Sequence, residues 1–167
     1  MINMEYENLV NIALQTMNKA ISFKSKVGAA ILVKDGTIFT GFNIETYIHK
    51  GYHAEEVALI SALKAGYKKN DFLAIAIVYS FEGEYPGCAS CRQYLWEFTN
   101  PDLVVVYYDI SSNKGSAFVL KDLYPYPYPS FKGGDKRSSM ENIKIEEPVK
   151  LVRETNERVE GPIDKPK

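Results

Sequence analysis

The sequence predicts an α/β protein with three layers, and two patterns support this prediction. Phe72 to Tyr79 is an apolar run rich in Ile and Val, which suits a strand buried on both faces. A segment that can form a helix, Cys91 to Phe98, and a further apolar strand, Leu103 to Tyr108, follow it along the chain. Strands of this kind alternating with helices are typical of a sheet covered on both sides.

The segment before this run predicts one helix and one hairpin. Glu5 to Ala20 carries apolar side chains at helical spacing, and Ser22 to Lys26 then breaks the pattern. Val27 to Val33 is an almost continuous apolar strand, Lys34 to Gly36 forms a turn, and Thr37 to Phe42 returns. We therefore expect a β-hairpin.

A second helix is expected from His53 to Ala65, after a loop over residues 43–52. Gly66 provides a suitable C-terminal stop. The helical periodicity is carried by Val57, Ile60, Ala62 and Leu63.

The C-terminal third is less regular. Ala117 to Leu123 favours either a short strand or a helical turn, whereas the alternate prolines of Tyr124 to Pro129 exclude regular structure. From Lys132 the sequence turns polar and charged. We therefore predict one compact domain over residues 1–131 and an extension over residues 132–167 that is disordered or docked on a neighbouring subunit.

Composition excludes several classes of protein. No apolar run approaches the roughly 20 residues that cross a bilayer, so we expect no membrane role. The N-terminus lacks the basic start and apolar stretch of a secretion signal, which predicts a cytoplasmic location. Twenty basic and twenty-one acidic side chains leave a net charge of −1, which argues against a nucleic acid partner.

The two cysteines of the chain, Cys88 and Cys91, are candidate metal ligands. They are too close in sequence for a core-stapling disulfide, and such a pair more often binds metal or does redox work in a reducing compartment. Zinc needs at least one more ligand, and the histidines are His49 and His53. His53 is the better candidate because it begins a predicted helix, as the cysteines do. A thioredoxin-type redox pair remains the alternative.

Glu55 is the candidate acid/base group. It lies two residues after His53, near the site but pointing elsewhere, so it can reach a water at the metal without occupying a coordination position. Zinc with three protein ligands keeps a fourth position open and lowers the pKa of a water there to about 7. The implied chemistry is hydrolytic replacement of an aromatic amine by a carbonyl oxygen.

These residues resemble a known signature. His53-Ala54-Glu55 followed by Pro-x-Cys-x-x-Cys at residues 86–91 is similar to the zinc nucleobase deaminase pattern. Residues 26–30, 41–45, 91–93 and 120–128 are similar to the corresponding stretches of the small cytidine deaminases, and the blasticidin-S deaminases are similar too.

The resemblance implies a fold and an activity. It implies a three-layer cytidine-deaminase-like fold, in which a central mixed five-stranded sheet has helices on both faces. It also implies zinc-dependent hydrolytic deamination of cytidine or deoxycytidine in pyrimidine salvage, with one zinc ion per subunit. The Tyr124 to Tyr128 segment resembles the part of the family chain that reaches a neighbouring subunit's site, which implies a homo-oligomer, a tetramer with a dimer as the alternative.

The resemblance also implies substrate contacts. The family's Asn-x-Glu pair binds the ribose hydroxyls, which carries over to Asn43 and Glu45. Phe23 and Phe39 are expected to line the base pocket, and Ala54 to contact the substrate.

Two departures from the family pattern concern the metal and the loop before it. Many small tetrameric cytidine deaminases have cysteine where this chain has His53, so zinc with one histidine and two thiolates here has a formal charge of zero. Arg92, whose family counterpart offsets thiolate charge, has less charge to offset. Gly87 is an additional residue between Pro86 and Cys88, and it alters the loop expected to contact the base.

Other functions remain open at this point. The altered loop favours deamination of a nucleoside antibiotic such as blasticidin S. A polynucleotide deaminase needs a basic channel, which the balanced charge does not favour. A noncatalytic deaminase-like protein with a structural zinc would need a fourth protein ligand, and His49 is the spare imidazole.

Overall fold

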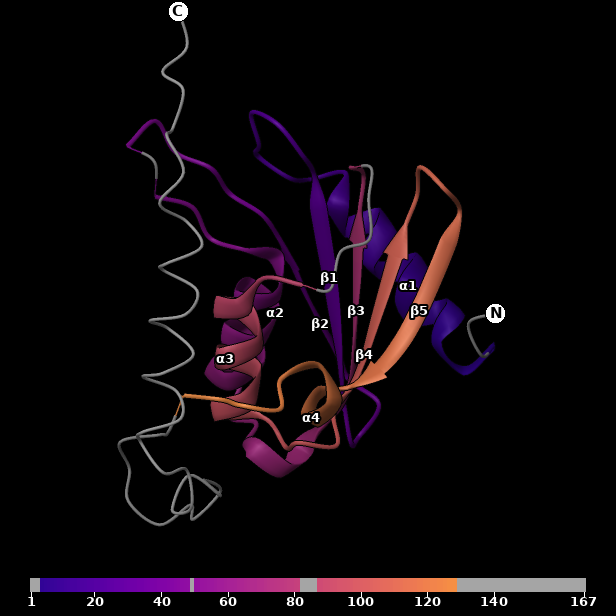
Figure 1. Ribbon diagram of the computed structural model, residues 1–167, viewed down its shortest axis with the longest axis vertical. Helices are drawn as coiled ribbons and strands as arrows, with labels where there is room; N and C mark the ends of the chain where they lie inside the picture. The colour runs from indigo at the N-terminus through magenta and orange to yellow at the C-terminus, as the bar shows by residue number, and fades with distance from the viewer. Residues whose placement is uncertain (1–3, 49, 82–86, 129–167) are drawn as a thin grey trace, which may run out of the picture. The chain divides into compact units, whose positions relative to one another are not determined.

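The computed structural model describes residues 4–48, 50–81 and 87–128, and these residues form an α/β fold around one sheet (Figure 1). The elements, in chain order, are α1 Met4–Met17, β1 Val27–Val33, β2 Ile38–Phe42, α2 Ala54–Lys64, the 3₁₀ helix η1 Lys69–Asp71, β3 Phe72–Tyr79, α3 Ala89–Phe98, β4 Val104–Asp109, β5 Lys114–Val119 and α4 Leu120–Leu123.

The sheet is mixed and has five strands in the order β2-β1-β3-β4-β5. β1 runs antiparallel to both β2 and β3, β3 runs parallel to β4, and β4 runs antiparallel to β5. The parallel pair is joined through α3, as a parallel connection requires a crossover.

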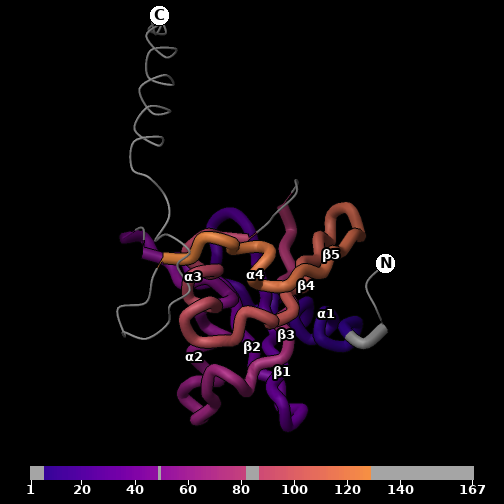
Figure 2. Tube along the Cα trace, turned by 60° about the horizontal axis from the view of Figure 1, so that its bottom comes forward, coloured from indigo at the N-terminus to yellow at the C-terminus, as the bar shows by residue number. Residues whose placement is uncertain are grey.

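Helices cover both faces of the sheet, which gives three layers. Figures 1 and 2 show α1 on one side of the strands and α2 and α3 on the other. One core lies under α1 and includes Leu9, Ala13, Met17 and Val78. The other lies under α2, α3 and α4 and includes Leu59, Ile77, Leu95 and Leu120. The expected three-layer fold with a mixed five-stranded sheet is confirmed.

Most expected elements occur near their expected bounds, and two details differ. The hairpin of β1 and β2 is present, and β3 is buried on both faces apart from Leu73 near its start. The choice between strand and helical turn near residue 117 resolves into both, since β5 begins earlier, at Lys114, and α4 follows it directly.

The buried face of α2 also differs from the expected one. Ile60 is 48% exposed, and the residues buried on this helix are Ala54, Glu55, Ala58, Leu59 and Ala62. Three of these five are alanines, and their small side chains let the helix pack closely against the sheet, while Leu59 fills the core.

Two glycines of the hairpin allow this close packing. A Cβ atom at Gly41 in β2 would lie 2.2 Å from the backbone oxygen of Ala54, at the start of α2. A Cβ atom at Gly28 in β1 would lie 2.2 Å from the backbone oxygen of Ala13 in α1. Each helix thus touches the sheet backbone at a position that only glycine leaves open.

Two expectations, the C-terminal extension and the lack of a membrane role, concern residues that the structure does not describe or describes only in part. The extension over residues 132–167 is outside them, so the division of the chain after residue 131 stays a prediction. Within the described part, none of the helices combines the length and the apolar character that crossing a bilayer needs.

Candidate metal centre and active site

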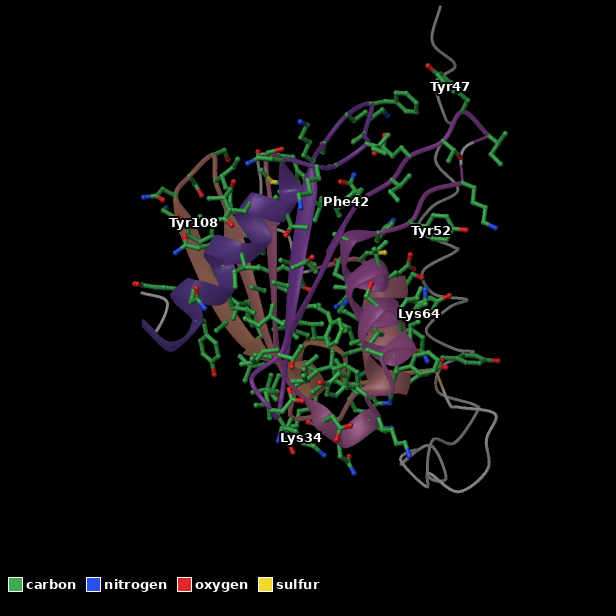
Figure 3. The ribbon with its side chains drawn as sticks, turned by 180° about the vertical axis from the view of Figure 1, so that it is seen from behind. Lys34, Phe42, Tyr47, Tyr52, Lys64 and Tyr108 are labelled. Carbon is green, nitrogen blue, oxygen red and sulfur yellow. The ribbon has the colours of Figure 1, made fainter. Side chains whose placement is uncertain are left out.

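The candidate site lies where two helices begin at the same end of the sheet. The parallel strands β3 and β4 end at Tyr79 and Asp109, which are paired with each other. α2 begins after His53, and α3 begins after Cys88. Figure 3 shows Phe42 and Tyr52 near this end and Lys34 at the opposite end. Ligands of open α/β sheets commonly bind outside the carboxyl ends of the strands.

His53, Cys88 and Cys91 come together at this end. Their ligand atoms all lie within 4.8 Å of one another, and the Nδ1 atom of His53 lies 3.2 Å from the Sγ atom of Cys91. Cys91 is 2% exposed, Cys88 is partly buried, and His53 is exposed. Residues 38 positions apart in the chain therefore form one group of two sulfurs and one imidazole nitrogen.

This donor set suits zinc. Two thiolates and one imidazole leave the fourth position of a tetrahedral ion open, as in catalytic zinc sites. Both cysteines are free of disulfide bonds. Burial, and then the charges of Glu55 and Cys88, raise the pKa of the Cys91 thiol above its usual range. A divalent cation would reverse this shift, because thiol ligands bind metal in the deprotonated form.

Glu55 lies beside the group without belonging to it. Its side chain is 2% exposed, and its Oε1 atom is buried with no hydrogen-bond partner. Burial raises the pKa of the Glu55 carboxyl, and the nearby His53 and Cys91 oppose this rise. A buried carboxylate with an unused oxygen is costly for the fold unless something binds there. The free oxygen is therefore available to a water or a substrate group at the site.

Helix starts position the ligands. The Glu56 carboxylate accepts a hydrogen bond of 3.1 Å from the His53 backbone N–H and so closes the first turn of α2. Cys88 is the N-cap residue of α3, and its carbonyl oxygen accepts a hydrogen bond from the Arg92 N–H. The positive ends of both helix dipoles favour negatively charged thiolates nearby.

Asn43 and Glu45, the expected ribose contacts, bind the loop before β1. The Asn43 Oδ1 atom accepts the Val27 N–H at 2.8 Å, and its Nδ2 atom donates to the Ser25 carbonyl at 2.9 Å. The Glu45 carboxylate accepts the Phe23 N–H at 2.8 Å and the Ser22 hydroxyl at 2.9 Å.

These contacts lower the pKa of Glu45, first through the Phe23 N–H and then through the Ser22 hydroxyl. An amide offers two donors and two acceptor positions, and a carboxylate offers about four acceptor positions. Asn43 and Glu45 can therefore hold this loop and still have capacity for a further ligand.

The two expected aromatic residues of the base pocket lie in different places. Phe23 is 59% exposed and packs on Tyr47, with ring centroids 4.9 Å apart. Phe39 packs against Tyr67, which follows the C-terminal end of α2, at 5.3 Å between centroids. Phe39 therefore lies near the C-terminal end of α2, whereas His53 lies at the N-terminal end of that helix. This position does not favour the expected role of Phe39 in the base pocket. Ala54, the first residue of α2, is fully buried.

Arg92 binds α4. Its Nη1 atom donates to the Leu123 carbonyl at 2.7 Å, and its guanidinium lies 5.7 Å from the centre of the Tyr124 ring. The side chain therefore ties α3 to the end of α4, which is a different task from the expected offset of thiolate charge.

The Tyr124 to Tyr128 segment runs along α3 of its own chain. The Gln93 Oε1 atom accepts hydrogen bonds of 2.9 Å from both the Tyr124 hydroxyl and the Tyr128 N–H. A pocket of about 570 Å³ lies between this segment and α3. It is lined by Ala89, Ser90, Gln93, Tyr94, Glu97, Phe98, Tyr124 and Tyr128, and neither cysteine is among these lining residues.

Sequence reasoning missed residues that support the site rather than form it. Gly41 allows the start of α2 to approach the sheet, and Glu56 closes its first turn. An isolated glycine within a strand pattern often marks a close backbone approach, and this signal was present at Gly41. His49 and Pro86 lie outside the described residues.

Fold and site together define a class of protein: a three-layer α/β protein with a zinc-type His/Cys/Cys group beside a buried carboxyl. Comparison with known proteins gives the family. Residues 4–107 match the cytidine and deoxycytidylate deaminase zinc-binding region. The cytidine deaminase of Sporosarcina psychrophila is 36% identical over 105 residues, which are 61% of this chain and 76% of the relative.

A second relative and a solved structure agree. The cytidine deaminase of Halalkalibacterium halodurans is 35% identical over 105 residues, 61% of this chain and 78% of the relative. The crystal structure of cytidine deaminase from Burkholderia pseudomallei superposes with a TM-score of 0.70 at 34% identity, over 75% of this chain and all of that one. The chain belongs to the cytidine and deoxycytidylate deaminase family, and it is an enzyme of the zinc-dependent deaminase type.

Proposed function

We propose that the chain hydrolyses cytidine or deoxycytidine to uridine or deoxyuridine and ammonia, with zinc as its cofactor. The observation that carries this proposal is the placement of three ligand atoms within 4.8 Å of one another beside the unpartnered Oε1 atom of Glu55. The names of the relatives, which are cytidine deaminases, support the substrate class.

His53, Cys88 and Cys91 hold the metal in this proposal, through Nδ1 and the two Sγ atoms. Zinc, when bound, activates a water molecule for attack on the C4 carbon of the pyrimidine. Because the three ligands would carry two negative charges together, the formal charges of zinc and its ligands would sum to zero.

Glu55 moves the protons. Its Oε1 atom takes one proton from the attacking water and gives it to the N3 atom of the base; it then takes the remaining proton from the same oxygen and delivers it to the departing amine. The C4–N bond breaks, ammonia leaves, and the oxygen of the water remains on C4 as the new carbonyl oxygen. The raised pKa of the Glu55 carboxyl suits a group that must hold a proton between these transfers.

Asn43 and Glu45 bind the ribose hydroxyls in this proposal, and Phe23 and Ala54 contact the substrate. The remaining acceptor positions of the Glu45 carboxylate and the remaining amide donor of Asn43 support this role. Both side chains follow β2, which ends at Phe42, on the end of the sheet where α2 begins. Arg92 holds α3 to the end of α4 through its hydrogen bond to the Leu123 carbonyl.

The assembly is proposed to be a homo-oligomer, a tetramer with a dimer as the alternative, and its setting to be cytoplasmic pyrimidine salvage. An aromatic face on the outside of α3 supports association, since Tyr94 and Phe98 are 42% and 40% exposed and Tyr128 is 59% exposed. Sedimentation analysis of the full chain tests this: a single monomeric species at micromolar concentration would contradict it.

A nucleoside antibiotic such as blasticidin S is the second candidate substrate. The observation that favours it is Gly87, which changes the loop next to Cys88 relative to the usual family pattern. A noncatalytic role would require a fourth protein ligand at the metal. Among the described residues, the ligand group contains His53, Cys88 and Cys91 and no fourth member.

The test is a direct assay of deamination. Purified zinc-loaded protein is incubated with cytidine, deoxycytidine and blasticidin S, and the loss of the absorbance of the amino-pyrimidine is followed together with ammonia release. We expect turnover of cytidine or deoxycytidine with the highest kcat/KM. Protein that holds one zinc ion per chain and leaves all three compounds unchanged would overturn the proposal.

A further inference from the structure

Gly87, the residue directly before Cys88, has an unusual backbone conformation. Its φ angle is +84°, in the left-handed region that L side chains rarely adopt. It is also buried, and a Cβ atom there would lie 1.9 Å from the Oη atom of Tyr107 and 2.8 Å from its Cζ atom. The backbone of Gly87 therefore rests directly on the phenol end of Tyr107.

Tyr107 is held by the sheet. It lies in β4, where it pairs with Ile77 of β3 on one side and with Ser116 of β5 on the other. Its side chain is 4% exposed, and its ring centroid lies 6.2 Å from that of Phe118. Because its backbone is paired on both sides and its side chain is buried in the core, the Tyr107 ring has little freedom to move.

The position of Cys88 depends more on the backbone conformation of the preceding residue than the position of Cys91 does. Cys91 is 2% exposed and lies one turn before Leu95, which is 1% exposed, so the packing of α3 fixes it. Cys88 is the N-cap residue, is only partly buried, and has the extended backbone angles φ −67° and ψ 135°. Its position therefore depends on the residue before it as well as on the hydrogen bond from the Arg92 N–H to its carbonyl oxygen.

We propose that Gly87 and Tyr107 are a positioning pair that places the Cys88 sulfur for metal binding. The proposal rests on the proposed function in so far as Cys88 is a zinc ligand. The additional residue before Cys88 is accommodated because glycine turns the chain with a positive φ and leaves no side chain between the backbone and the Tyr107 ring. Any other residue at 87 lifts the chain off the ring and moves Cys88 with it.

The size of this effect follows from the contact distances. Ordinary contact begins at 3.4 Å, so a methyl group at residue 87 and the Tyr107 Oη atom must separate by about 1.5 Å, and the buried ring of Tyr107 leaves the chain at residue 87 to take up most of this shift. A zinc–sulfur bond is about 2.3 Å long and tolerates errors of about 0.2 Å. A movement of this size disturbs the metal site even where the fold is retained.

Gly66 provides a matched control for backbone strain. Its φ angle is +99°, and a Cβ atom there would have nothing within 4 Å. Gly66→Ala therefore introduces the same kind of left-handed strain as Gly87→Ala without the contact with a ring.

The test compares zinc affinity in the full-length wild type, Gly87→Ala, Gly66→Ala, Tyr107→Phe and the double variant of Gly87→Ala with Tyr107→Phe. Affinity is measured by competition with a chromophoric chelator. The thiolate-to-cobalt absorption of the Co²⁺-loaded proteins reports separately on whether both sulfurs are bound.

We expect Gly87→Ala to lose about 10- to 100-fold in zinc affinity, the range typical of residues that orient ligands, and to lose part of the thiolate absorption. Gly66→Ala keeps the wild-type values. The Gly87→Ala change should cost less zinc affinity when it is made in Tyr107→Phe than when it is made in the wild type. The reason is that removal of Oη relieves the 1.9 Å contact and leaves the 2.8 Å contact with Cζ. If Gly87→Ala fails to fold, recovery of folded, zinc-binding protein in the double variant supports the pair.

Either of two results would overturn the proposed positioning role: Gly87→Ala with wild-type zinc affinity and thiolate absorption, or a loss of zinc affinity in Gly87→Ala that the double variant does not reduce. Failure of the proposed function is distinguishable from these. Wild-type protein that binds zinc and deaminates nothing refutes the proposed reaction alone, whereas wild-type protein that binds no zinc refutes both.

Discussion

The contact between Gly41 and α2 gives a prediction with a built-in control. A Cβ atom at Gly41 would lie 2.2 Å from the Ala54 oxygen and 2.4 Å from the Ala58 nitrogen. Since ordinary contact begins at 3.4 Å, Gly41→Ala forces the start of α2 away from the sheet by about 1.2 Å. Overpacking of this kind costs about 1–3 kcal/mol in the free energy of unfolding.

The displaced turn carries His53 and Glu55, so the site moves with it. A misplacement of about 1 Å can cost about 10²-fold in rate, and we expect a loss of this order in kcat/KM together with weaker zinc binding. The measurements are urea unfolding, zinc content and the rate of cytidine deamination.

Gly28→Ala is the control. Its Cβ atom would lie 2.2 Å from the Ala13 oxygen and 2.5 Å from the Met17 nitrogen of α1, on the other face of the sheet. We expect a similar loss of stability, with zinc content and rate close to wild type in the folded protein. The reasoning fails if Gly41→Ala folds with unchanged zinc content and rate, or if Gly28→Ala loses as much activity as Gly41→Ala.

Three further predictions concern Glu45, Arg92 and the metal. The folded-state pKa of Glu45 is lowered from 4.5, so its charge stabilises the fold above the unfolded-state pKa and this stabilisation disappears as pH falls through the folded-state pKa. Glu45→Gln should therefore flatten the acid limb of urea unfolding below about pH 4.5, and an unchanged limb would contradict this. Arg92→Ala loses the hydrogen bond to the Leu123 carbonyl, so it should lower the free energy of unfolding by about 1–3 kcal/mol and leave the zinc content unchanged. Lower zinc content at unchanged stability would contradict this and support the charge-offset role. Zinc at one hundred times its Kd should stabilise the wild type by about 2.7 kcal/mol, and Cys88→Ser should abolish most of this gain in thermal unfolding; an equal gain in both proteins would show binding elsewhere.

The sequence predicted those parts of the fold whose signals are local. The apolar run of β3 and the turn between β1 and β2 define their own structure, and both were located closely. β5 was expected to begin later because Lys114 to Ser116 carry no apolar pattern, and this end of the strand is mostly exposed. Ile60 was placed in the helical periodicity, yet close packing favours the small residues on the other side of α2.

The sequence indicates the chemistry of the site but not the residues that hold its ligands in position. The sequence singles out His53, Glu55, Cys88 and Cys91 because their residue types and spacing have a specific chemical meaning, and the structure brings the three possible metal ligands among them together. The contact of Gly87 with Tyr107 joins residues 20 positions apart, and no local pattern reports such a meeting.

Asn43 and Glu45 show the same limit. Their residue types suggested a ligand, whereas the structure shows that both also hold the loop before β1. Only the folded chain reveals that these side chains have a structural partner as well.

Zinc content and deamination rate measured together on Glu55→Gln test the central claim most directly. Glutamine keeps the size of the side chain but cannot carry the proton, so the protein should retain one zinc ion per chain while its rate on cytidine falls by about 10²- to 10⁴-fold. Full activity in Glu55→Gln would contradict the account, because the buried carboxyl oxygen beside the metal ligands would then have no part in the reaction.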